Sequence, residues 1–491
     1  MQGSVPRARL RWLGLVGAAA MAASAYLAGT PSPHGPAWVV GVALWVAGAG
    51  GLLAVWWRLR TVADLRWLLL TGALWALPLL LAPPLGSHDS YAYACQGELV
   101  TAGLDPYRNG AAALPCRWLE HVAPSWRDTP TPYGPLWLFV ERIATSAGLL
   151  GSAGLPVTVT VLRLVAIGGT LLAVVAGIRL ARRCGGDPAR VAWLAATSPL
   201  TLVHVVSGAH NDALLAGLVV AGLAVAATDR VDVPTRLALA GAAFGAAASV
   251  KATALVVVPF AVAVVPWART GRRQVTAVLI LLAATGGTFG LLAVLTGHGL
   301  GFLHGWSATA GSVQWSSVPT GVGMAVGYGL RAVGRPELFA GAVTVTRAAG
   351  LVALAVILVL LLRRAVRGGT GAAVPAAGLA LLATAVLGPV FYAWYALAGV
   401  AVLATAPKRP GRLGDLLDAG SAGLVLLTLP NSLGLVTKTK VAGALLDVCL
   451  VLWALASRLR PTRPPAWRRT AGRPRLPLLR LRDSGAAGRP G

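Results

Sequence analysis

Apolar segments of roughly 20 residues recur along the whole chain, separated by short polar or basic connections. A helix of about 20 apolar residues matches the hydrocarbon thickness of a bilayer. The composition agrees, because 56% of the 491 residues are hydrophobic and only 12% are charged, a balance that a water-soluble domain does not need. The 60 glycines suit close packing of helices in lipid. The sequence therefore predicts an all-α polytopic membrane protein whose single membrane domain covers residues 1–457.

The positive charges predict the orientation of this domain. Much of the formal net charge of +26 comes from short connections, which contain Arg7, Arg9, Arg11, Arg58, Arg60, Arg179, Arg182, Arg183, Arg269, Arg272, Arg273, Arg363, Arg364, Arg367, Lys408 and Arg409. Such an excess of basic residues marks cytoplasmic loops, so we expect both termini inside. Residues 458–491 are predicted to form a disordered cytoplasmic tail that rests on anionic membrane lipid, and nucleic acid is not an expected partner.

Fourteen spanning helices are expected, near residues 12–30, 38–56, 67–85, 157–180, 189–207, 211–227, 236–250, 253–268, 274–297, 341–362, 372–390, 392–406, 416–433 and 441–457. The first is interpreted as a retained helix, because no small-residue cleavage site follows it. Between Gly86 and Arg179 only an odd number of crossings fits the basic connections, so segment 136–150 is expected to be an interfacial or re-entrant helix. Counting the crossings between basic connections in this way also predicts two outer loops, 86–156 and 298–340.

The longest polar interruption is the stretch from Ser87 to Leu136. Asp89 follows the third predicted span directly, where a carboxylate can take a proton from a sugar hydroxyl while a lipid-borne leaving group waits at the interface. The alternative interpretation of Asp89 is a helix-terminal residue in contact with water. Further substrate-binding candidates in this stretch are His88, Tyr91, Tyr93, Asp105, Tyr107 and Tyr133.

A second polar group, formed by His210, Asn211 and Asp212, lies in a predicted outer turn between two spans. Ionisable residues at such a depth are rare unless they are functional, and these side chains suit hydrogen bonds to sugar hydroxyls. A polar cap on a helical hairpin is the alternative. His210 and Asp212 would supply half of a metal site, but the sequence offers no evident third ligand, so no metal is expected.

Lys251 interrupts an apolar hairpin, where an ammonium group without a partner is costly. A lysine suits a phosphate oxygen. We therefore predict that Lys251 binds a lipid phosphate, with Arg163 and Arg347, in the outer halves of their helices, as further candidates. The alternative is that the Lys251 side chain extends to the membrane surface.

Aromatic residues gather in two segments that are expected on the outer face. Tyr392, Trp394 and Tyr395 lie in the first segment, and His304 with Trp306 lies in the second outer loop. These residue types serve in sugar stacking and equally in the aromatic belt of a membrane interface. The sequence leaves both roles open.

The four cysteines are too few for a disulfide framework or a metal cluster. Cys95 and Cys116 both fall in the first outer loop, where a bridge between them would be stable in an oxidising compartment. The sequence leaves that bridge open.

Taken together, these motifs resemble the GT-C class of polyprenyl-phosphate-sugar glycosyltransferases. They are most similar to the actinobacterial polyprenol-phosphomannose-dependent α-1,6-mannosyltransferases that build the mannan core of lipomannan and lipoarabinomannan. The resemblance covers most of the membrane core and is carried by Asp89-Ser90-Tyr91-Ala92-Tyr93 with Gln96-Gly97, Gly103-Leu104-Asp105-Pro106-Tyr107, Pro132-Tyr133-Gly134-Pro135, and Gly208 to Ala213.

The resemblance implies a GT-C-type bundle of about 14 transmembrane helices whose outer loops carry short interfacial helices. It also implies inverting transfer from a lipid-linked sugar donor on the extracytoplasmic side of the cell membrane, without nucleotide sugars. No cofactor is expected. Consistently, the sequence contains no P-loop and no Rossmann glycine fingerprint.

We therefore predict transfer of a mannosyl residue from polyprenyl-phosphomannose to a mannan or lipoglycan acceptor in α-1,6 linkage. Asp89 would be the base, and Lys251 would bind the phosphate. Transfer of another polyprenyl-phosphate-linked sugar is the first alternative. A transporter or flippase is the second, but transporters usually place polar residues at the membrane midplane of repeated halves, whereas here the polar residues crowd one face.

Overall fold

The structure, a computed structural model, describes residues 6–29, 35–149, 154–265, 271–303, 305, 311–408, 412–432 and 434–459. His304 and Trp306 lie outside the described residues, as does the predicted tail beyond residue 459. The chain divides into two compact units, residues 1–447 and 448–491. The first unit contains all the described candidate residues.

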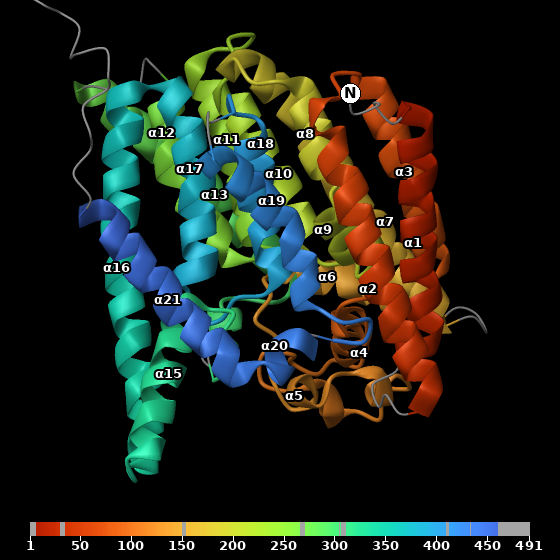
Figure 1. Ribbon diagram of the computed structural model, residues 1–491. Helices are drawn as coiled ribbons and strands as arrows, with labels where there is room; N and C mark the ends of the chain where they lie inside the picture. The colour runs from red at the N-terminus through yellow and green to blue at the C-terminus, as the bar shows by residue number, and fades with distance from the viewer. Residues whose placement is uncertain are drawn as a thin grey trace, which may run out of the picture. The chain divides into compact units, whose positions relative to one another are not determined.

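Helices make up almost all of the regular structure (Figure 1). Their bounds are α1 Arg7–Ala28, α2 Gly35–Arg58, α3 Leu65–Leu81, α4 Asp89–Thr101, α5 Pro124–Arg127, α6 Pro135–Leu149, α7 Gly154–Cys184, α8 Pro188–Ala195, α9 Pro199–Thr201, α10 Asp212–Ala226, α11 Val233–Ala248, α12 Val258–Val264, α13 Gly271–Thr296, α15 Val318–Ala332, α16 Phe339–Gly368, α17 Thr370–Leu387, α18 Leu397–Ala404, α19 Arg412–Gly423, α20 Gly434–Lys438 and α21 Lys440–Leu459. Among the described residues there is no strand, and one isolated β-bridge joins Leu429 and Ser432.

The described helices agree with an all-α membrane protein. Seven of them are long and apolar enough to cross a membrane, and the pair Pro188–Ala195 and Pro199–Ser207, bent by 42°, would add an eighth. Five further predicted spans coincide with apolar helices of only 10–17 residues. The count of fourteen crossings therefore stays a prediction.

The stretch 416–433, which was predicted to be one spanning helix, is broken. α19 ends at Gly423, a 3₁₀ turn follows at Leu424–Leu427, and extended chain then reaches Pro430. Proline lacks a backbone donor and glycine weakens a helix, which explains the break. The extended chain has its own role, because the carbonyl of Pro430 accepts a hydrogen bond of 3.0 Å from the N–H of Gly86.

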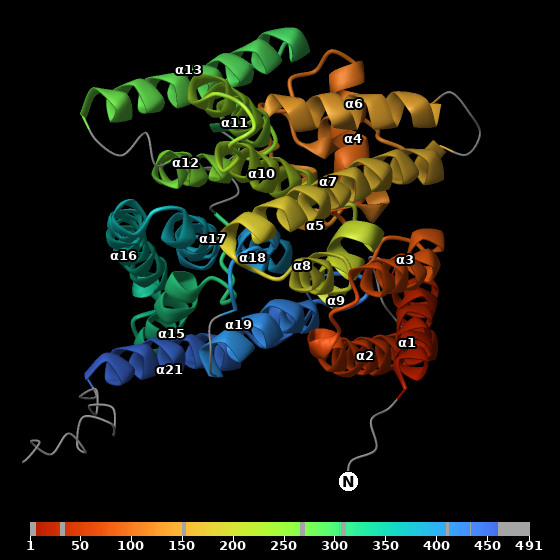
Figure 2. The ribbon, with the colours of Figure 1, turned by 90° about the horizontal axis from the view of Figure 1, so that it is seen from above.

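Small residues bring the central helices into backbone contact, as the glycine content predicts. α7 and α10 cross at Gly169 and Gly217, where a Cβ on Gly217 would lie 2.3 Å from the carbonyl oxygen of Gly169. Figure 2 shows these two helices side by side. The largest group of buried apolar side chains surrounds α10 and reaches Phe244 of α11 and Phe260 of α12.

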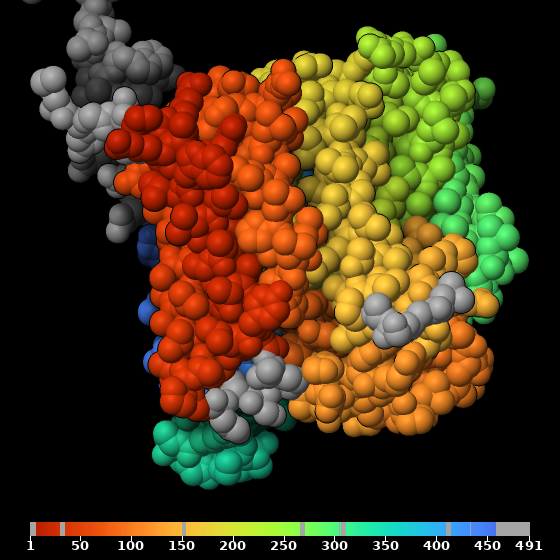
Figure 3. All heavy atoms as spheres, turned by 90° about the vertical axis from the view of Figure 1, so that its right-hand side faces the viewer, coloured from red at the N-terminus to blue at the C-terminus, as the bar shows by residue number. Residues whose placement is uncertain are grey.

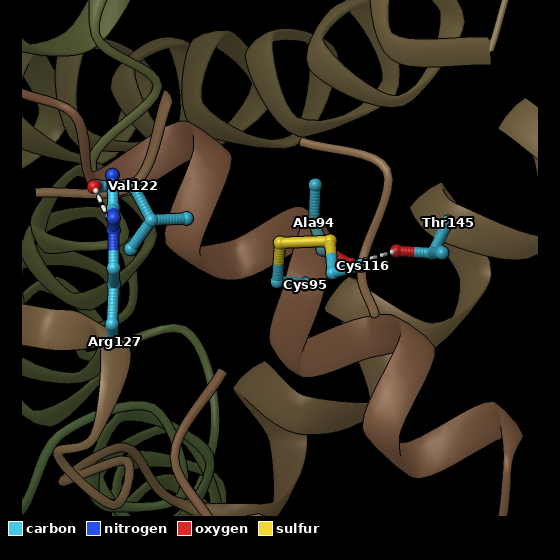
Figure 4. The surroundings of a disulfide bond; sticks show 6 residues. All are labelled: Ala94, Cys95, Cys116, Val122, Arg127 and Thr145. Atoms are coloured by element: carbon cyan, nitrogen blue, oxygen red, sulfur yellow. Dashed lines mark hydrogen bonds between the residues drawn. A yellow bond between two sulfur atoms is a disulfide. The ribbon is translucent and has the colours of Figure 1, made fainter. Parts of the chain in front are cut away.

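The first predicted outer loop contains short helices, as expected. Its residues, orange in Figure 3, gather at one end of the first unit, and α4 packs between α6 and α7. Cys95 of α4 forms a disulfide with Cys116, which settles the bridge that the sequence leaves open (Figure 4). Close by, the hydroxyl of Thr145 in α6 donates to the carbonyl of Ala94 at 3.1 Å. The interfacial position predicted for 136–150, which is α6, stays a prediction.

The second predicted outer loop, 298–340, also holds a helix. α15 spans 15 residues of it and packs against α16. The 33-residue helical stretch Pro336–Gly368 is long enough to cross a membrane, in agreement with the span predicted at 341–362.

Candidate active site

Breaks in several helices bring polar backbone and side chains together at the end of the unit that carries α4. A π-helical segment, Leu202–Ser207, precedes the turn to α10, and Ala209 in this turn has a φ of 54°, which is uncommon for a residue other than glycine. The turn is tied to the first outer loop, because the hydroxyl of Ser90 donates to the carbonyl of Gly208 at 2.6 Å. Strained backbone of this kind often marks a functional site.

Asp89 is the first residue of α4 and is buried, with 8% of its surface exposed. Its backbone N–H donates to the hydroxyl of Ser87 at 2.9 Å. Burial raises the pKa of Asp89 to about 6, an effect that Ser87 and Lys251 oppose and Asp212 reinforces. Asp89 is therefore not a helix-terminal residue in open water, and a carboxylate with this pKa is well suited to accept a proton near neutral pH.

His210 and Asn211 are fully buried beside Asp89. Nδ1 of His210 lies 3.5 Å from Oδ2 of Asp89, yet the polar side-chain atoms of His210 and Asn211 make no hydrogen bond with any described residue. Burial lowers the pKa of His210 well below its ordinary value, so the neutral ring offers one donor and one acceptor. Buried polar atoms without partners are rare, and this pair suits a ligand rich in hydroxyl groups.

The Lys251 ammonium group has a partner within the protein. Nζ of Lys251 lies 3.1 and 3.2 Å from the two carboxylate oxygens of Asp212 and 3.6 Å from the ring centroid of Tyr395. All three side chains are largely enclosed. Lys251 therefore has a carboxylate partner that the sequence analysis did not predict, and its contact with a lipid phosphate stays a prediction.

Trp394 is buried in the 3₁₀ turn Ala393–Ala396 and its ring is already covered. It stacks on His210 with ring centroids 3.9 Å apart and on Tyr392 at 5.0 Å. With 2% of its surface exposed, Trp394 has no free face on which a sugar can stack. Its contact instead fixes the plane of the His210 ring.

Tyr93 and Tyr133 belong to the same neighbourhood, since the Tyr133 ring centroid lies 6.0 Å from Nζ of Lys251. Their hydroxyl groups are 3.5 Å apart, and Tyr93 makes edge contacts with the rings of Tyr133 and Trp137. The Tyr-Gly-Pro turn docks on the segment that precedes Lys251, because the N–H of Gly134 donates to the carbonyl of Val250 at 3.0 Å. The first outer loop and the Lys251 segment thus share backbone hydrogen bonds.

Comparison with known proteins gives the family of the chain. Residues 11–269, more than half of the chain, match the family described as alpha-(1->6)-mannopyranosyltransferase, N-terminal domain. The chain belongs to the alpha-(1->6)-mannopyranosyltransferase family. Residues 319–458 match the MptB C-terminal domain.

Two curated relatives illustrate the similarity to this mannopyranosyltransferase family. The chain is 34% identical over 337 residues to alpha-(1->6)-mannopyranosyltransferase A of Mycobacterium tuberculosis, with 66% of this chain and 62% of that protein covered. It is 32% identical over 343 residues to alpha-(1->6)-mannopyranosyltransferase B of Corynebacterium glutamicum, with 66% and 56% covered. The chain thus spans less than two thirds of the length of either relative. No solved structure matches it.

In this member of the mannopyranosyltransferase family, Arg163 holds the backbone around the site. Its guanidinium group, buried in α7, donates to the carbonyls of Leu80, Ala82 and Ser207 at 2.8 to 3.0 Å. These bonds join the end of α3 to the π-helical segment. A phosphate would have to compete with three carbonyl oxygens for this arginine.

Arg347 belongs to a different neighbourhood. It lies on α16 and donates to the hydroxyl of Thr320 at 2.9 Å and to the carbonyl of Ser312 at 2.5 Å. Thr320 in turn donates to the carbonyl of Pro389 at 2.7 Å. Arg347 therefore joins α16 and α15 to the segment that leads to Trp394.

Asp105 and Tyr107 line a cavity of about 400 Å³ whose polar side chains include Arg142 and His298. Asp105 shapes the turn by accepting from the N–H of Tyr107 at 2.9 Å. The hydroxyl of Tyr107 is buried without a partner among the described residues. This cavity lies beyond the immediate surroundings of Asp89 and has the polar lining that a sugar needs.

His88 and Tyr91 are engaged within the loop. The ring of His88 bonds to the carbonyl of His121, and Tyr91 stacks on the His121 ring with centroids 5.2 Å apart. Burial lowers the pKa of His88 and raises that of Tyr91. Both side chains support the loop that carries Asp89.

Two buried polar residues of this neighbourhood were not predicted as site residues. His204 lies in the π-helical segment, 5.2 Å from the Trp394 ring and 5.7 Å from the His210 ring, and Glu141 lies in α6. Within the described residues neither ring nitrogen of His204 has a hydrogen-bond partner. Burial raises the pKa of Glu141 well above its ordinary value, an effect that Trp137 opposes. The signal for His204 was present, since an ionisable residue inside an apolar run is functional by default.

In the described part of the chain, no three histidine, cysteine or carboxylate side chains come together as metal ligands.

Proposed function

We propose that the chain transfers a mannosyl residue from polyprenyl-phosphomannose to a mannan or lipoglycan acceptor, with inversion and in α-1,6 linkage. Membership in the alpha-(1->6)-mannopyranosyltransferase family supports the sugar and the linkage. The observation that carries the proposal is the enclosed Asp89 carboxyl group beside His210 and Asn211, whose polar atoms lack partners within the described chain.

In the proposed reaction Asp89 accepts the proton of an acceptor hydroxyl. The hydroxyl oxygen attacks the anomeric carbon from the side opposite the phosphate, the bond from that carbon to the phosphate oxygen breaks, and polyprenyl phosphate leaves. The neutral His210 ring and the Asn211 amide would orient sugar hydroxyls, since together they offer donors and acceptors. A positioned base of this kind contributes about 10²–10⁴ in rate.

Lys251 would offset the charge that develops on the departing phosphate. Asp212 and Tyr395 hold its ammonium group in place at 3.1 and 3.6 Å, and a fixed cation in an enclosed site needs little reorganisation during the reaction. We do not assign Arg163 to the phosphate, because backbone carbonyls occupy its guanidinium group. Arg347 remains a candidate for contact with the lipid donor.

The reaction is proposed on the extracytoplasmic side of the cell membrane. Arg163, next to the site, precedes Arg179 by 16 residues of α7, which is about 24 Å along a helix. That distance is most of the roughly 30 Å hydrocarbon thickness. Because the basic end of α7 is expected in the cytoplasm, the Asp89 end would face outward.

The acceptor is expected to extend toward the 400 Å³ cavity lined by Asp105 and Tyr107. The buried Tyr107 hydroxyl and the exposed side of Asp105 offer hydrogen bonds there. Tyr93 and Tyr133 would form the wall between this cavity and Asp89.

The decisive test is transfer of radiolabelled mannose from polyprenyl-phosphomannose to short α-mannosides by the purified chain in detergent, without nucleotide sugar. Wild type should transfer, and Asp89→Asn should lose at least about 100-fold in rate. Asp128→Asn is the matched control, because Asp128 is an exposed residue of the same loop, and it should keep wild-type rates. Near wild-type transfer by Asp89→Asn would remove Asp89 from the mechanism. Transfer only from a different lipid-linked sugar would overturn mannose as the donor.

A further inference from the structure

A second cavity lies toward the opposite end of α7, beside α10. It measures about 850 Å³ and is lined by Leu172, Ala176, Arg179, Arg182, Arg183, Ala221, Ala224, Val225, Thr228, Asp229 and Arg230. We call these residues the arginine groove. None of them takes part in the reaction proposed for Asp89, which lies near Arg163, about 24 Å away along α7.

The charges of the arginine groove are unbalanced. Arg183 is paired with Asp229 at 2.6 Å and also donates to the carbonyl of Ala227. The guanidinium groups of Arg179, Arg182 and Arg230 are exposed, and none is hydrogen-bonded or within 4 Å of a carboxylate in the described chain. Four arginines therefore face one aspartate, and the groove carries an excess of three positive charges.

The other part of the groove is apolar. Leu172 and Ala176 of α7 face Ala221, Ala224 and Val225 of α10 along it. From Leu172 to Arg183 the groove follows α7 for 11 residues, which is about 16 Å. The apolar part of this wall, from Leu172 to Ala176, covers about 6 Å. It lies on the side of the arginines that faces the hydrocarbon, where the first part of an acyl chain would follow a phosphate.

A solvated basic surface would need only the arginines and no apolar wall behind them. The combination of clustered guanidinium groups with an apolar wall next to them matches a phospholipid, whose phosphate meets the arginines and whose acyl chains continue along the helices. We propose that the arginine groove binds one anionic phospholipid of the leaflet at this face. The bound lipid would fill the gap between α7 and α10.

The experiment measures binding of radiolabelled phosphatidylglycerol and phosphatidylcholine to the purified full chain in neutral detergent. Wild type should prefer phosphatidylglycerol. Arg179→Gln/Arg182→Gln/Arg230→Gln should lose that preference, by roughly fivefold per arginine and about 100-fold in all. The control, Arg363→Gln/Arg364→Gln/Arg367→Gln, removes the same charge from exposed residues of α16 and should bind as wild type does. Size-exclusion profiles check that all variants are folded.

A further variant distinguishes a lipid from a free phosphate ion. Ala224→Trp fills the apolar part of the groove and leaves the arginines in place, so it should weaken phosphatidylglycerol binding. Inorganic phosphate should compete poorly with the lipid for wild type and for this variant alike. Equal loss in the α16 control would mean that net charge alone attracts the lipid. The proposal would be overturned by such an equal loss in the control. It would also be overturned if the groove variant bound lipid as wild type does, or if millimolar phosphate displaced the lipid completely.

Discussion

Arg163 and Arg183 lie on the same helix, α7, and differ in what surrounds their guanidinium groups. Arg163 is buried and donates to three backbone carbonyls at helix breaks, whereas Arg183 is exposed and pairs with Asp229 at the end of α10. Around Arg163, charges and polar groups are enclosed by neighbouring segments. Around Arg183, they face outward from regular helices. The stability of a buried charge depends on each of its partners, whereas water can replace the partner of an exposed charge.

The largest effect is expected at the buried Lys251–Asp212 pair, at the Arg163 end. Lys251→Met should lower the free energy of unfolding by about 3–5 kcal/mol, because it leaves the Asp212 carboxylate buried without its partner. Thermal unfolding in detergent, followed by tryptophan fluorescence, measures the loss. A change below about 1 kcal/mol would show that the pair is no more than a surface contact.

A double variant separates the stability of this pair from its proposed role in catalysis. Lys251→Met/Asp212→Leu removes both charges, so much of the lost stability should return while mannosyl transfer stays impaired. Recovery of transfer together with stability would assign the pair a structural role only.

The next effect concerns the disulfide that anchors α4. Cys95→Ser/Cys116→Ser should destabilise the protein by about 3 kcal/mol, since the bridge closes a loop with a sequence separation of 21. The same unfolding assay measures it, with Cys184→Ser as the matched control because Cys184 is a free cysteine. An unchanged melting temperature would mean that the contacts of α4 with α6 suffice to hold the loop.

A smaller, pH-dependent effect follows from the raised pKa of Asp89. Since burial raises this pKa to about 6, the carboxyl group is ionised above pH 6 and gains a proton below it. A general base works only when ionised, so kcat should be constant above about pH 7 and fall roughly tenfold per pH unit below 6. A profile of kcat against pH tests this, and a midpoint near 4 would indicate a solvated carboxylate.

The smallest effect is expected at the Arg183 end. Arg183→Gln breaks an exposed ion pair, and such pairs contribute about 0–1 kcal/mol, so the melting temperature should hardly change. A loss comparable to that of Lys251→Met would contradict the contrast between the two ends of α7.

The sequence predicted features that follow from composition and chain order. Apolar length predicted long helices such as α7, α13 and α16, and the glycines predicted close helix packing. The position of Asp89 after a span made it the candidate base, and that role stays a prediction. The break after Gly423 was missed, because the prediction of one span over 416–433 gave more weight to the hydrophobic residues of this segment than to its proline and two glycines.

The partners of the polar residues could not be predicted in the same way. Lys251 meets Asp212 39 positions away, and Trp394 covers His210 from a segment much later in the chain. Such pairs depend on which helices become neighbours, and hydrophobic length and charge patterns do not show that. The same reason explains why the sequence left open whether Trp394 stacks on sugar, although its ring is already stacked on His210 and Tyr392.

The Cys95–Cys116 bridge has a consequence for the timing of synthesis. Both cysteines belong to the first quarter of the chain, and closing the bridge needs only the segment from α4 to residue 116. The residues that enclose Asp89, among them His210 and Lys251, are made later. The loop with the acid can thus be locked into shape first, as a template onto which the later helices assemble.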